Sequence, residues 1–104
     1  MTLYALIFKG GLRTGELTSE YSNRFVEWAS KVASSRTQGN RFKQEGMVVS
    51  TKGVRTMDFG SDTVGGYIVV EADSYEKAVE IAKGCPILEN NGTVEIREIV
   101  PRDG

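Results

Sequence analysis

The chain has 104 residues, of which 39% are hydrophobic and 26% charged, and its formal net charge at pH 7 is −1. This size and balance indicate a single soluble domain, residues 1–104, that is large enough for its own core. No apolar run reaches the roughly 20 residues of a membrane-spanning helix, no signal peptide begins the chain, and one cysteine forms no internal disulfide, so we expect a cytoplasmic protein.

Residues 2–8 are predicted to form the first strand. Alternate side chains of a strand point to opposite faces, and here both sets are apolar. Leu3, Ala5 and Ile7 share one face, and Tyr4, Leu6 and Phe8 share the other. Helices can cover one face of a small sheet, so the second face must be covered by something else.

A glycine-containing loop, residues 9–17, precedes the first predicted helix. Its glycine spacing resembles a phosphate-binding loop, but Glu16 stands where that motif needs lysine, so we interpret the loop as a connector. Thr18 is placed to cap the helix, and an apolar stripe extends to about Ser35. Trp28, on that stripe, is interpreted as a core anchor or as the wall of a ligand cavity.

The middle of the chain is predicted to be a polar linker followed by a hairpin. Residues 34–40 are polar and contain no apolar pattern. Residues 41–51 and 53–59 are predicted to be two strands that turn at Lys52-Gly53, where glycine supplies the backbone conformation of a tight turn. Gly65-Gly66 then opens the central strand and indicates a bulge or a close backbone approach.

Residues 62–86 combine a strand and a helix with local start and stop signals. Tyr67 to Val70 is an apolar run of strand length. Asp73 and Glu76 have the spacing of a capping box, and Pro86 prevents continuation of the helix. Residues 93–100 are predicted to form the last strand.

The resulting order, β-α-β-β(-β)-α-β, predicts a ferredoxin-like α+β sandwich, with an antiparallel sheet and two helices on one face. The other sheet face, apolar in the first and central strands, would need a partner. We expect it to pair with the same face of a second copy, which gives a homodimer in the form of a dimeric α/β barrel.

The stretch G-G-Y-I-V-V-E-A-D-S-Y-E-K-A-V-E-I-A-K-G-C-P, followed by G-T-V-E-I-R-E-I, resembles the second half of YCII-related proteins of the DGPF type. The resemblance implies a ferredoxin-like dimeric barrel, and members of the family are mostly of unknown activity. The Asp-Gly-Pro-Phe motif is reduced here to Asp58-Phe59-Gly60. Some members have a His–Asp pair proposed as catalytic, but this chain has no histidine and carries Cys85 before Pro86.

The lack of histidine narrows the available chemistry. Triads and Cys-His nucleophiles are excluded, and a zinc site is not expected, because one cysteine and carboxylates would be its only ligands. We expect no metal and no cofactor. Cys85 lies at a helix C-terminus, where the dipole disfavours a thiolate, so we interpret it as a buried structural residue. Asp58 is the candidate catalytic carboxylate; the alternative is a turn residue.

Charge is divided unevenly along the chain. Residues 31–56 contain six basic residues and one acid, whereas residues from 57 onward contain ten acids and four bases. Three interpretations stay open: a basic pocket for a small anion, a nucleic-acid surface, and pairing of basic with acidic elements within a dimer. The lack of a base-stacking motif and the negative net charge argue against nucleic acid, and no membrane partner is expected.

A small polar or anionic ligand is therefore predicted where the Asp58 segment meets the basic hairpin. Arg41 and Arg55 would hold the anion, and Trp28 and Tyr67 would form walls. An odd separation in a strand puts Arg55 and Asp58 on opposite faces, so a shared pocket requires a bulge or the other subunit. Two classes of function stay open: a small-molecule-binding dimer that acts as a cofactor-free enzyme, or a non-catalytic binding or accessory protein.

Overall fold

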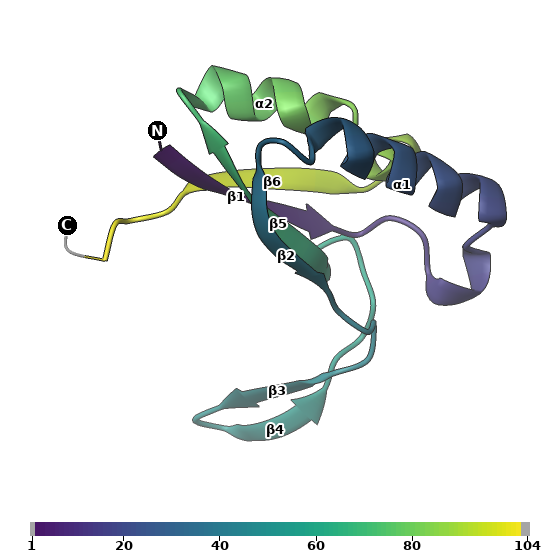
Figure 1. Cartoon of the computed structure of the whole chain (residues 1–104). Coiled ribbons are helices and arrows are strands. Elements are labelled where there is room, and N and C mark those ends of the chain that lie inside the picture. The colour runs from purple at the N-terminus through teal and green to yellow at the C-terminus, as the bar shows by residue number, and fades with distance from the viewer. Residues whose placement is uncertain (1, 103–104) are drawn as a thin grey trace.

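The computed structural model describes residues 2–102, which form a four-stranded antiparallel sheet with helices on one face, and a separate hairpin (Figure 1). The strand order in the sheet is β2-β5-β1-β6, and β3 pairs with β4 alone. The elements are β1 (Thr2–Lys9), α1 (Ser19–Val32), β2 (Arg36–Arg41), β3 (Met47–Ser50), β4 (Gly53–Thr56), β5 (Val64–Ala72), α2 (Tyr75–Lys83) and β6 (Thr93–Glu98), with short 3-10 turns at Thr14–Glu16 and Pro86–Asn90.

This arrangement confirms the ferredoxin-like α+β prediction. The first and last strands lie side by side, β5 lies on the other side of β1, and both helices cover the same face. The helix-facing side chains of β1, Tyr4, Leu6 and Phe8, are all buried. They pack with Trp28 of α1 and with α2 in one core. None of the described helices is long and apolar enough to cross a membrane.

The predicted linker is wrong: residues 36–41 form β2, the edge strand of the sheet. They pair antiparallel with β5, from Arg36 opposite Val70 to Arg41 opposite Gly66. The segment R-T-Q-G-N-R has no apolar side chain, so alternation could not reveal it. The backbone of this segment pairs with the apolar strand β5, and this pairing holds it in the sheet. Backbone hydrogen bonds do not require apolar side chains.

Two further local predictions need correction. The α2 cap is Ser74, whose hydroxyl accepts a hydrogen bond from the Lys77 backbone N–H, so the Asp73–Glu76 capping box is wrong. Ser74 offers the same acceptor one residue later, where the chain is already extended (φ −160°). The hairpin exists but is shorter than predicted, with Thr51 and Lys52 between the paired Ser50 and Gly53.

The glycine pair at the start of the central strand has the predicted effect. Phe8 pairs with Gly66 and Lys9 with Val64, so Gly65 is the extra residue of a bulge in β5. A Cβ on Gly66 would lie 2.7 Å from the Asn40 carbonyl oxygen. Gly66 therefore lets β2 approach β5 closely, which positions the edge strand opposite α1.

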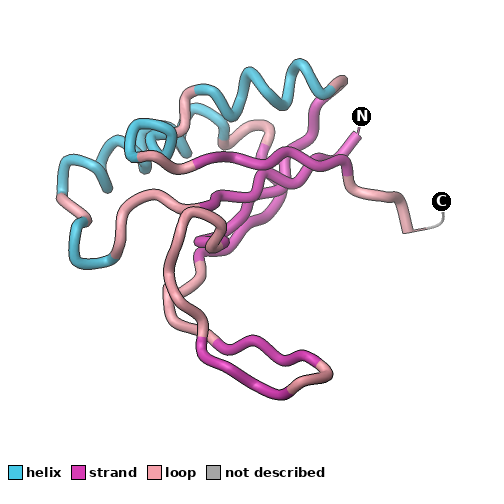
Figure 2. Tube along the Cα trace, turned by 180° about the vertical axis from the view of Figure 1, so that it is seen from behind, coloured by secondary structure: helices cyan, strands magenta, loops and turns pink. Residues whose placement is uncertain are grey.

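The helix-free face of the sheet is apolar, as predicted, but less exposed than expected. Leu3 is 38% exposed and Val69 only 3%. Ala5 and Ile7 are partly buried. The hairpin β3–β4 hangs on this same side of the sheet, away from the helices, as both backbone views show (Figures 1 and 2).

Candidate functional site

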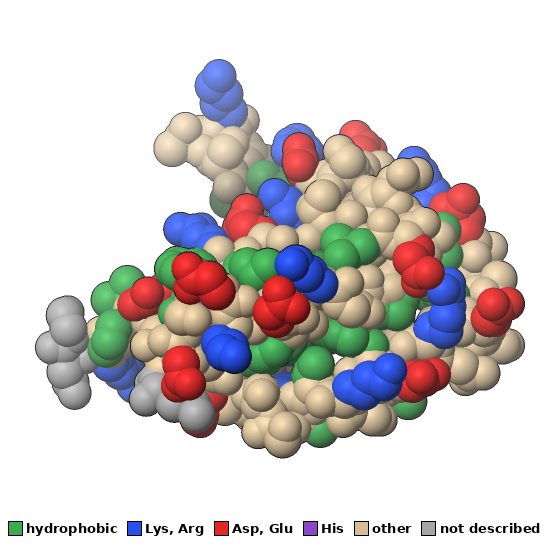
Figure 3. All heavy atoms as spheres, turned by 90° about the horizontal axis from the view of Figure 1, so that it is seen from above, with side chains coloured by type: hydrophobic (Ala, Val, Ile, Leu, Met, Phe, Trp, Pro, Cys, Tyr) green, Lys and Arg blue, Asp and Glu red, His purple; other side chains and the backbone are tan. Residues whose placement is uncertain are grey.

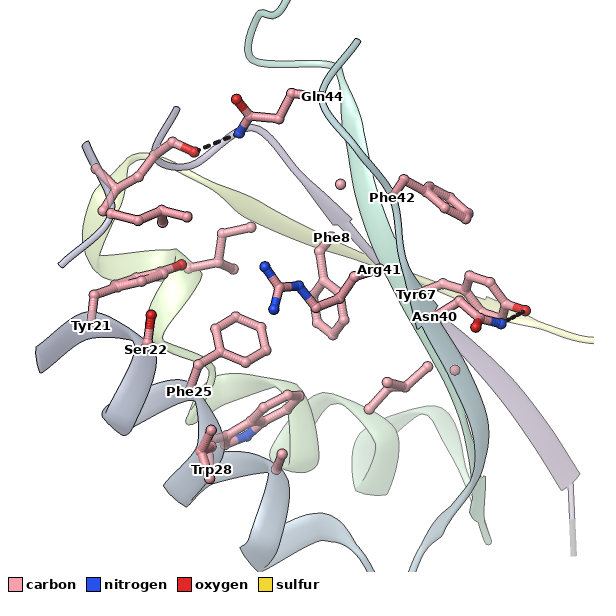
Figure 4. A pocket seen from close by; sticks show the side chains of 18 of the residues that line it. Phe8, Tyr21, Ser22, Phe25, Trp28, Asn40, Arg41, Phe42, Gln44 and Tyr67 are labelled. Atoms are coloured by element: carbon pink, nitrogen blue, oxygen red, sulfur yellow. Dashed lines mark hydrogen bonds between the residues drawn. The ribbon is translucent and has the colours of Figure 1, made fainter. Parts of the chain in front are cut away.

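A cleft of about 810 Å³ lies on the helical side of the sheet, between α1 and the edge strand β2 with the segment that follows it. Phe8 and Ile68 contribute to its floor from the sheet. Figure 4 shows side chains from α1 on one side and from β2 on the other, with Arg41 reaching into the space between them. The cleft is therefore built by the one strand that lacks apolar residues and the helix that faces it.

The α1 wall is aromatic because three rings recur at helical spacing. Tyr21, Phe25 and Trp28 lie on one face of the helix. The rings of Phe25 and Trp28 each meet Phe8 edge-on, with centroids 5.8 and 5.9 Å apart. The Trp28 indole N–H donates to the Ile81 carbonyl at 3.0 Å, so this wall is fixed to α2. Trp28 is thus both the core anchor and a wall of the cleft.

The β2 wall carries arginines where a core strand would carry apolar residues. Arg36, Gly39 and Arg41 pair with the helix-facing positions of β5, because the register shifts between Arg36 and Gln38. A Cβ on Gly39 would lie 3.1 Å from the Arg36 guanidinium nitrogen. The missing side chain at Gly39 therefore leaves room for Arg36 to lie along the strand, while Arg41 extends toward α1 (Figure 4).

The cleft contains basic groups without acidic ones. Arg36, Arg41 and Lys43 line it, and no Asp or Glu does so within the described residues. These three cations also form no ion pair and donate no side-chain hydrogen bond in the part of the chain that the structure describes. On the helical surface seen in Figure 3, by contrast, acidic and basic side chains alternate. The cleft is therefore a local positive site beside an apolar wall.

Neither titratable group at the base of the α1 wall provides a proton acceptor near neutral pH. Burial raises the pKa of Tyr21, the negative charge of an ionised Cys85 would raise it further, and Arg24 and Arg41 lower it. Burial raises the pKa of Cys85 to about 11, and the side chain is 2% exposed. Tyr21 can donate a hydrogen bond, but Cys85 stays a protonated thiol, in agreement with its predicted burial.

A family model described as the YCII-related domain matches residues 18–103 of the sequence. The chain belongs to the YCII-related family. Its structure is similar to that of 5-chloro-2-hydroxyhydroquinone dehydrochlorinase (TftG) from Burkholderia phenoliruptrix AC1100 in complex with 2,5-dihydroxybenzoquinone. That likeness has a TM-score of 0.64 at 11% identity, covers 94% of this chain and 93% of the dehydrochlorinase, and supports the fold. No curated protein matches the sequence.

The structure brings together three of the five site residues predicted for this YCII-related chain. Trp28, Arg41 and Tyr67 all line the cleft. The Tyr67 side chain lies on the far side of the strands, where its hydroxyl accepts from the Asn40 amide at 3.2 Å (Figure 4). Trp28 and Arg41 therefore contribute side chains to the cleft, whereas Tyr67 contributes through its strand.

Arg55 and Asp58 are not among the residues that line the cleft. Arg55 lies exposed on β4, with its guanidinium 3.4 Å from the Thr56 carbonyl. Asp58 follows β4 in an irregular segment and is exposed; its backbone carbonyl accepts from the Thr63 hydroxyl. Within one chain, the carboxylate predicted to act in catalysis is thus separate from the aromatic and basic cleft.

The sequence does not predict Arg36 and Gly39 as parts of the site, because residues 34–40 are interpreted as a linker, and it places Lys43 only in the basic stretch 31–56. One signal was present. In a ferredoxin-like order, a strand follows the first helix. The residues that directly follow that helix include Arg36, Gly39 and Arg41, so they are the candidates for this strand. An edge strand whose helix-facing residues are arginine and glycine indicates a cleft in place of core.

Proposed function

We propose that this YCII-related protein binds a small, flat organic anion in the cleft between α1 and β2. The observation that carries the proposal is the lining: three cations without acidic partners face a wall of aromatic rings. An aromatic wall favours an apolar ring, and unpaired guanidinium groups favour a carboxylate or a phenolate on that ring. The ligand class is therefore an aromatic acid or an acidic phenol.

Cleft size and donor geometry support this class. The volume of about 810 Å³ lies within the range of about 300–1,000 Å³ usual for small-molecule sites. Arg41 extends from β2 toward Tyr21 and Phe25, so an anion held by its guanidinium would place the attached ring against the α1 wall. Tyr21, protonated at neutral pH, would donate a further hydrogen bond to that anion.

The likeness to the dehydrochlorinase points in the same direction. The dehydrochlorinase is in complex with 2,5-dihydroxybenzoquinone, a flat ring with acidic hydroxyl groups. A ligand of that shape and charge suits a cleft with an aromatic side and a basic side. At 11% identity the reaction itself is not transferred to this chain.

The protein is further proposed to work as a homodimer through the helix-free faces of its sheets. Leu3 and Ile7 lie on that face and would be covered by a second copy. Burial of an exposed leucine contributes about 1.5–3 kcal/mol at most, so several such residues are needed to hold the dimer.

Enzymatic activity without a cofactor is the alternative within the same site, and it depends on Asp58. The cleft lining contains no carboxylate among the described residues, so a general base would have to come from outside it. Asp58 would have to reach a bound ligand from the second copy. Asp58→Asn would then abolish turnover and leave ligand affinity unchanged.

Calorimetric titration with matched pairs of ligands tests the proposal. Benzoates and acidic phenols should bind, and the corresponding neutral benzamides and anisoles should bind at least tenfold more weakly, which is about 1.4 kcal/mol. Arg41→Met should lower the affinity for the anions tenfold or more, because it keeps the length of the side chain and removes the charge.

Arg55→Met provides the matched control, since it removes the same charge from the hairpin, outside the cleft. Unchanged affinity in Arg55→Met is expected. Equal binding of anions and neutral analogues would contradict the anion proposal. A loss in Arg55→Met equal to that in Arg41→Met would instead place the ligand at the hairpin.

A further inference from the structure

The hairpin β3–β4 presents an apolar face that nothing in the described chain covers. Met47 and Val49 on β3 share one face with Val54 on β4, because Val49 pairs directly with Val54 and Met47 with Thr56. These three side chains are 64%, 76% and 61% exposed. A two-stranded hairpin alone is at best marginally stable in water, so an uncovered apolar face on it indicates a partner.

We propose that the hairpin is an arm that clasps a second copy of this chain, with the face formed by Met47, Val49 and Val54 against the body of that copy. The position of the arm supports this occupant. It hangs on the helix-free side of the sheet (Figures 1 and 2). In the sheet-face dimer proposed above, on which this inference rests, the packed sheets lie about 10 Å apart, so a second copy on that face would lie beside the arm.

A further exposed apolar side chain lies between the sheet and the arm. Phe42, between β2 and β3, is 49% exposed, and its ring lies 6.0 Å from that of Tyr67 on the helix-free side. Residues 43–46 connect Phe42 to β3. One partner surface could therefore cover the sheet face, Phe42 and the arm together.

Charge favours the body of a second copy over another arm. Lys52, in the turn, and Arg55, which points to the opposite face of the hairpin from Val54, have no ion pair within the described residues. Glu71, opposite Leu3 on the helix-free face, is exposed and likewise has none in that part of the chain. Two basic arms would repel one another, whereas an arm placed near Glu71 of a second copy, away from Arg97 on the same face, would be attracted. A twofold axis makes both contacts equivalent and closes the assembly.

Sedimentation equilibrium on the full chain and its variants tests the arm. Val49→Ser with Val54→Ser should raise the dimer dissociation constant at least tenfold, because two apolar side chains leave the interface without a change in the sheet. The matched control is Val26→Ser, which removes a valine of similar exposure (65%) from the helical side and should leave association unchanged. These exposed substitutions leave the packed core intact.

Mixing separates arm-to-body from arm-to-arm contact. An armless variant lacks residues 47–56 and joins Gly46 to Met57 through a short glycine link. Gly46 and Met57 are already adjacent, since the Met57 N–H donates to the Gly46 carbonyl at 2.9 Å. If each arm contacts the body of the other copy, a mixed dimer of the armless variant with the wild type keeps one arm contact. Its affinity should then lie between those of the wild-type and armless homodimers. A mixed dimer as weak as the armless homodimer would overturn arm-to-body contact.

The outcomes also separate this proposal from that of the sheet-face dimer. A wild-type protein that is monomeric at micromolar concentration overturns both. A stable wild-type dimer that tolerates the valine substitutions and the excision overturns the arm alone, and leaves the sheet-face dimer standing. An arm that binds another protein from the cell but adds nothing to self-association also overturns it.

Discussion

The edge strand β2 and the hairpin β3–β4 follow one another in the chain and are both basic, yet they present their charges in opposite settings. In β2, Arg36 and Arg41 face a wall of aromatic side chains across a concave cleft. In the hairpin, Lys52 lies in the turn and Arg55 lies on the face opposite to the exposed apolar side chains. Charge of the same sign therefore stands once in a cavity and once on a protruding surface.

The difference shows that the shape of the surface around an unpaired basic side chain determines which kind of partner that side chain can bind. A concave site that is lined by rings and cations excludes a large partner and selects a small anion. A protruding, two-stranded surface encloses no ligand, and its apolar face can be covered only by another folded body. One basic segment of sequence, residues 36–56, thus divides into a ligand site and an association site.

The largest expected effect tests how strongly the cleft side depends on close packing, which the arm lacks. Gly66→Ala should lower the free energy of unfolding by about 2–4 kcal/mol, because the new Cβ would collide with the Asn40 carbonyl and push β2 off β5. Gly65→Ala is the control; a Cβ there meets nothing within 4 Å. Urea unfolding measures both, and equal stability of the two variants would contradict the close approach.

The thiol under the α1 wall gives the next effect. Cys85 has its pKa raised to about 11 in the fold, above the ordinary value of 9.0. Between these values the unfolded chain loses the thiol proton and the folded chain keeps it, so stability falls as pH rises. The expected loss is about 2–3 kcal/mol from pH 9 to 11, and none near pH 7.

Cys85→Ala isolates this contribution from the lysines and tyrosines that titrate in the same range. Unfolding of the wild type and the variant is compared at several values of pH. The stability advantage of the wild type should shrink above pH 9. Rapid labelling of the folded wild type by an alkylating reagent at neutral pH would show instead that the thiol is accessible.

Much of the fold follows from local sequence signals, and the exceptions lie where pairing decides. The strand at residues 2–8 and the helix from Ser19 are predictable because apolar alternation and the Thr18 cap are local features. The strand β2 is not, since its backbone is held by β5 while its side chains are polar. The cap at Ser74 could not be separated from Asp73 because both residues offer an acceptor.

The site was predictable in part for the same reason. Trp28 and Arg41 were identified by residue type, and the fold brings them into one cleft. Arg55 and Asp58 are near Arg41 in sequence, but the hairpin carries Arg55 away from the body. Composition and periodicity do not show that a hairpin protrudes from the body of the protein. Proximity in sequence therefore wrongly suggests that Arg55 lies near Arg41.

A smaller effect distinguishes the two arginines of the cleft. Arg36→Met should weaken binding of an aromatic acid about threefold to tenfold, less than Arg41→Met, because Arg36 lies along β2 rather than reaching toward α1. Lys77→Met, which removes a charge from the exposed surface of α2, is the control. Calorimetry with one aromatic acid measures all three, and a larger loss in Arg36→Met would make Arg36 the primary anion holder.

The smallest effect concerns the charges of the arm. Lys52→Gln with Arg55→Gln should raise the dimer dissociation constant about twofold to fivefold at low salt, since an exposed ion pair contributes about 0.2–1 kcal/mol. The difference between variant and wild type should vanish near 0.5 M salt, where the screening length is roughly 4 Å. The two substitutions should leave the affinity for an aromatic acid unchanged at either salt concentration. Sedimentation at the two salt concentrations measures this. A difference that persists at high salt would mean that shape and apolar contact, rather than charge, orient the arm. Tighter association after removal of the charges would mean that two basic arms face one another, so that the arm would not lie on the body of the second copy.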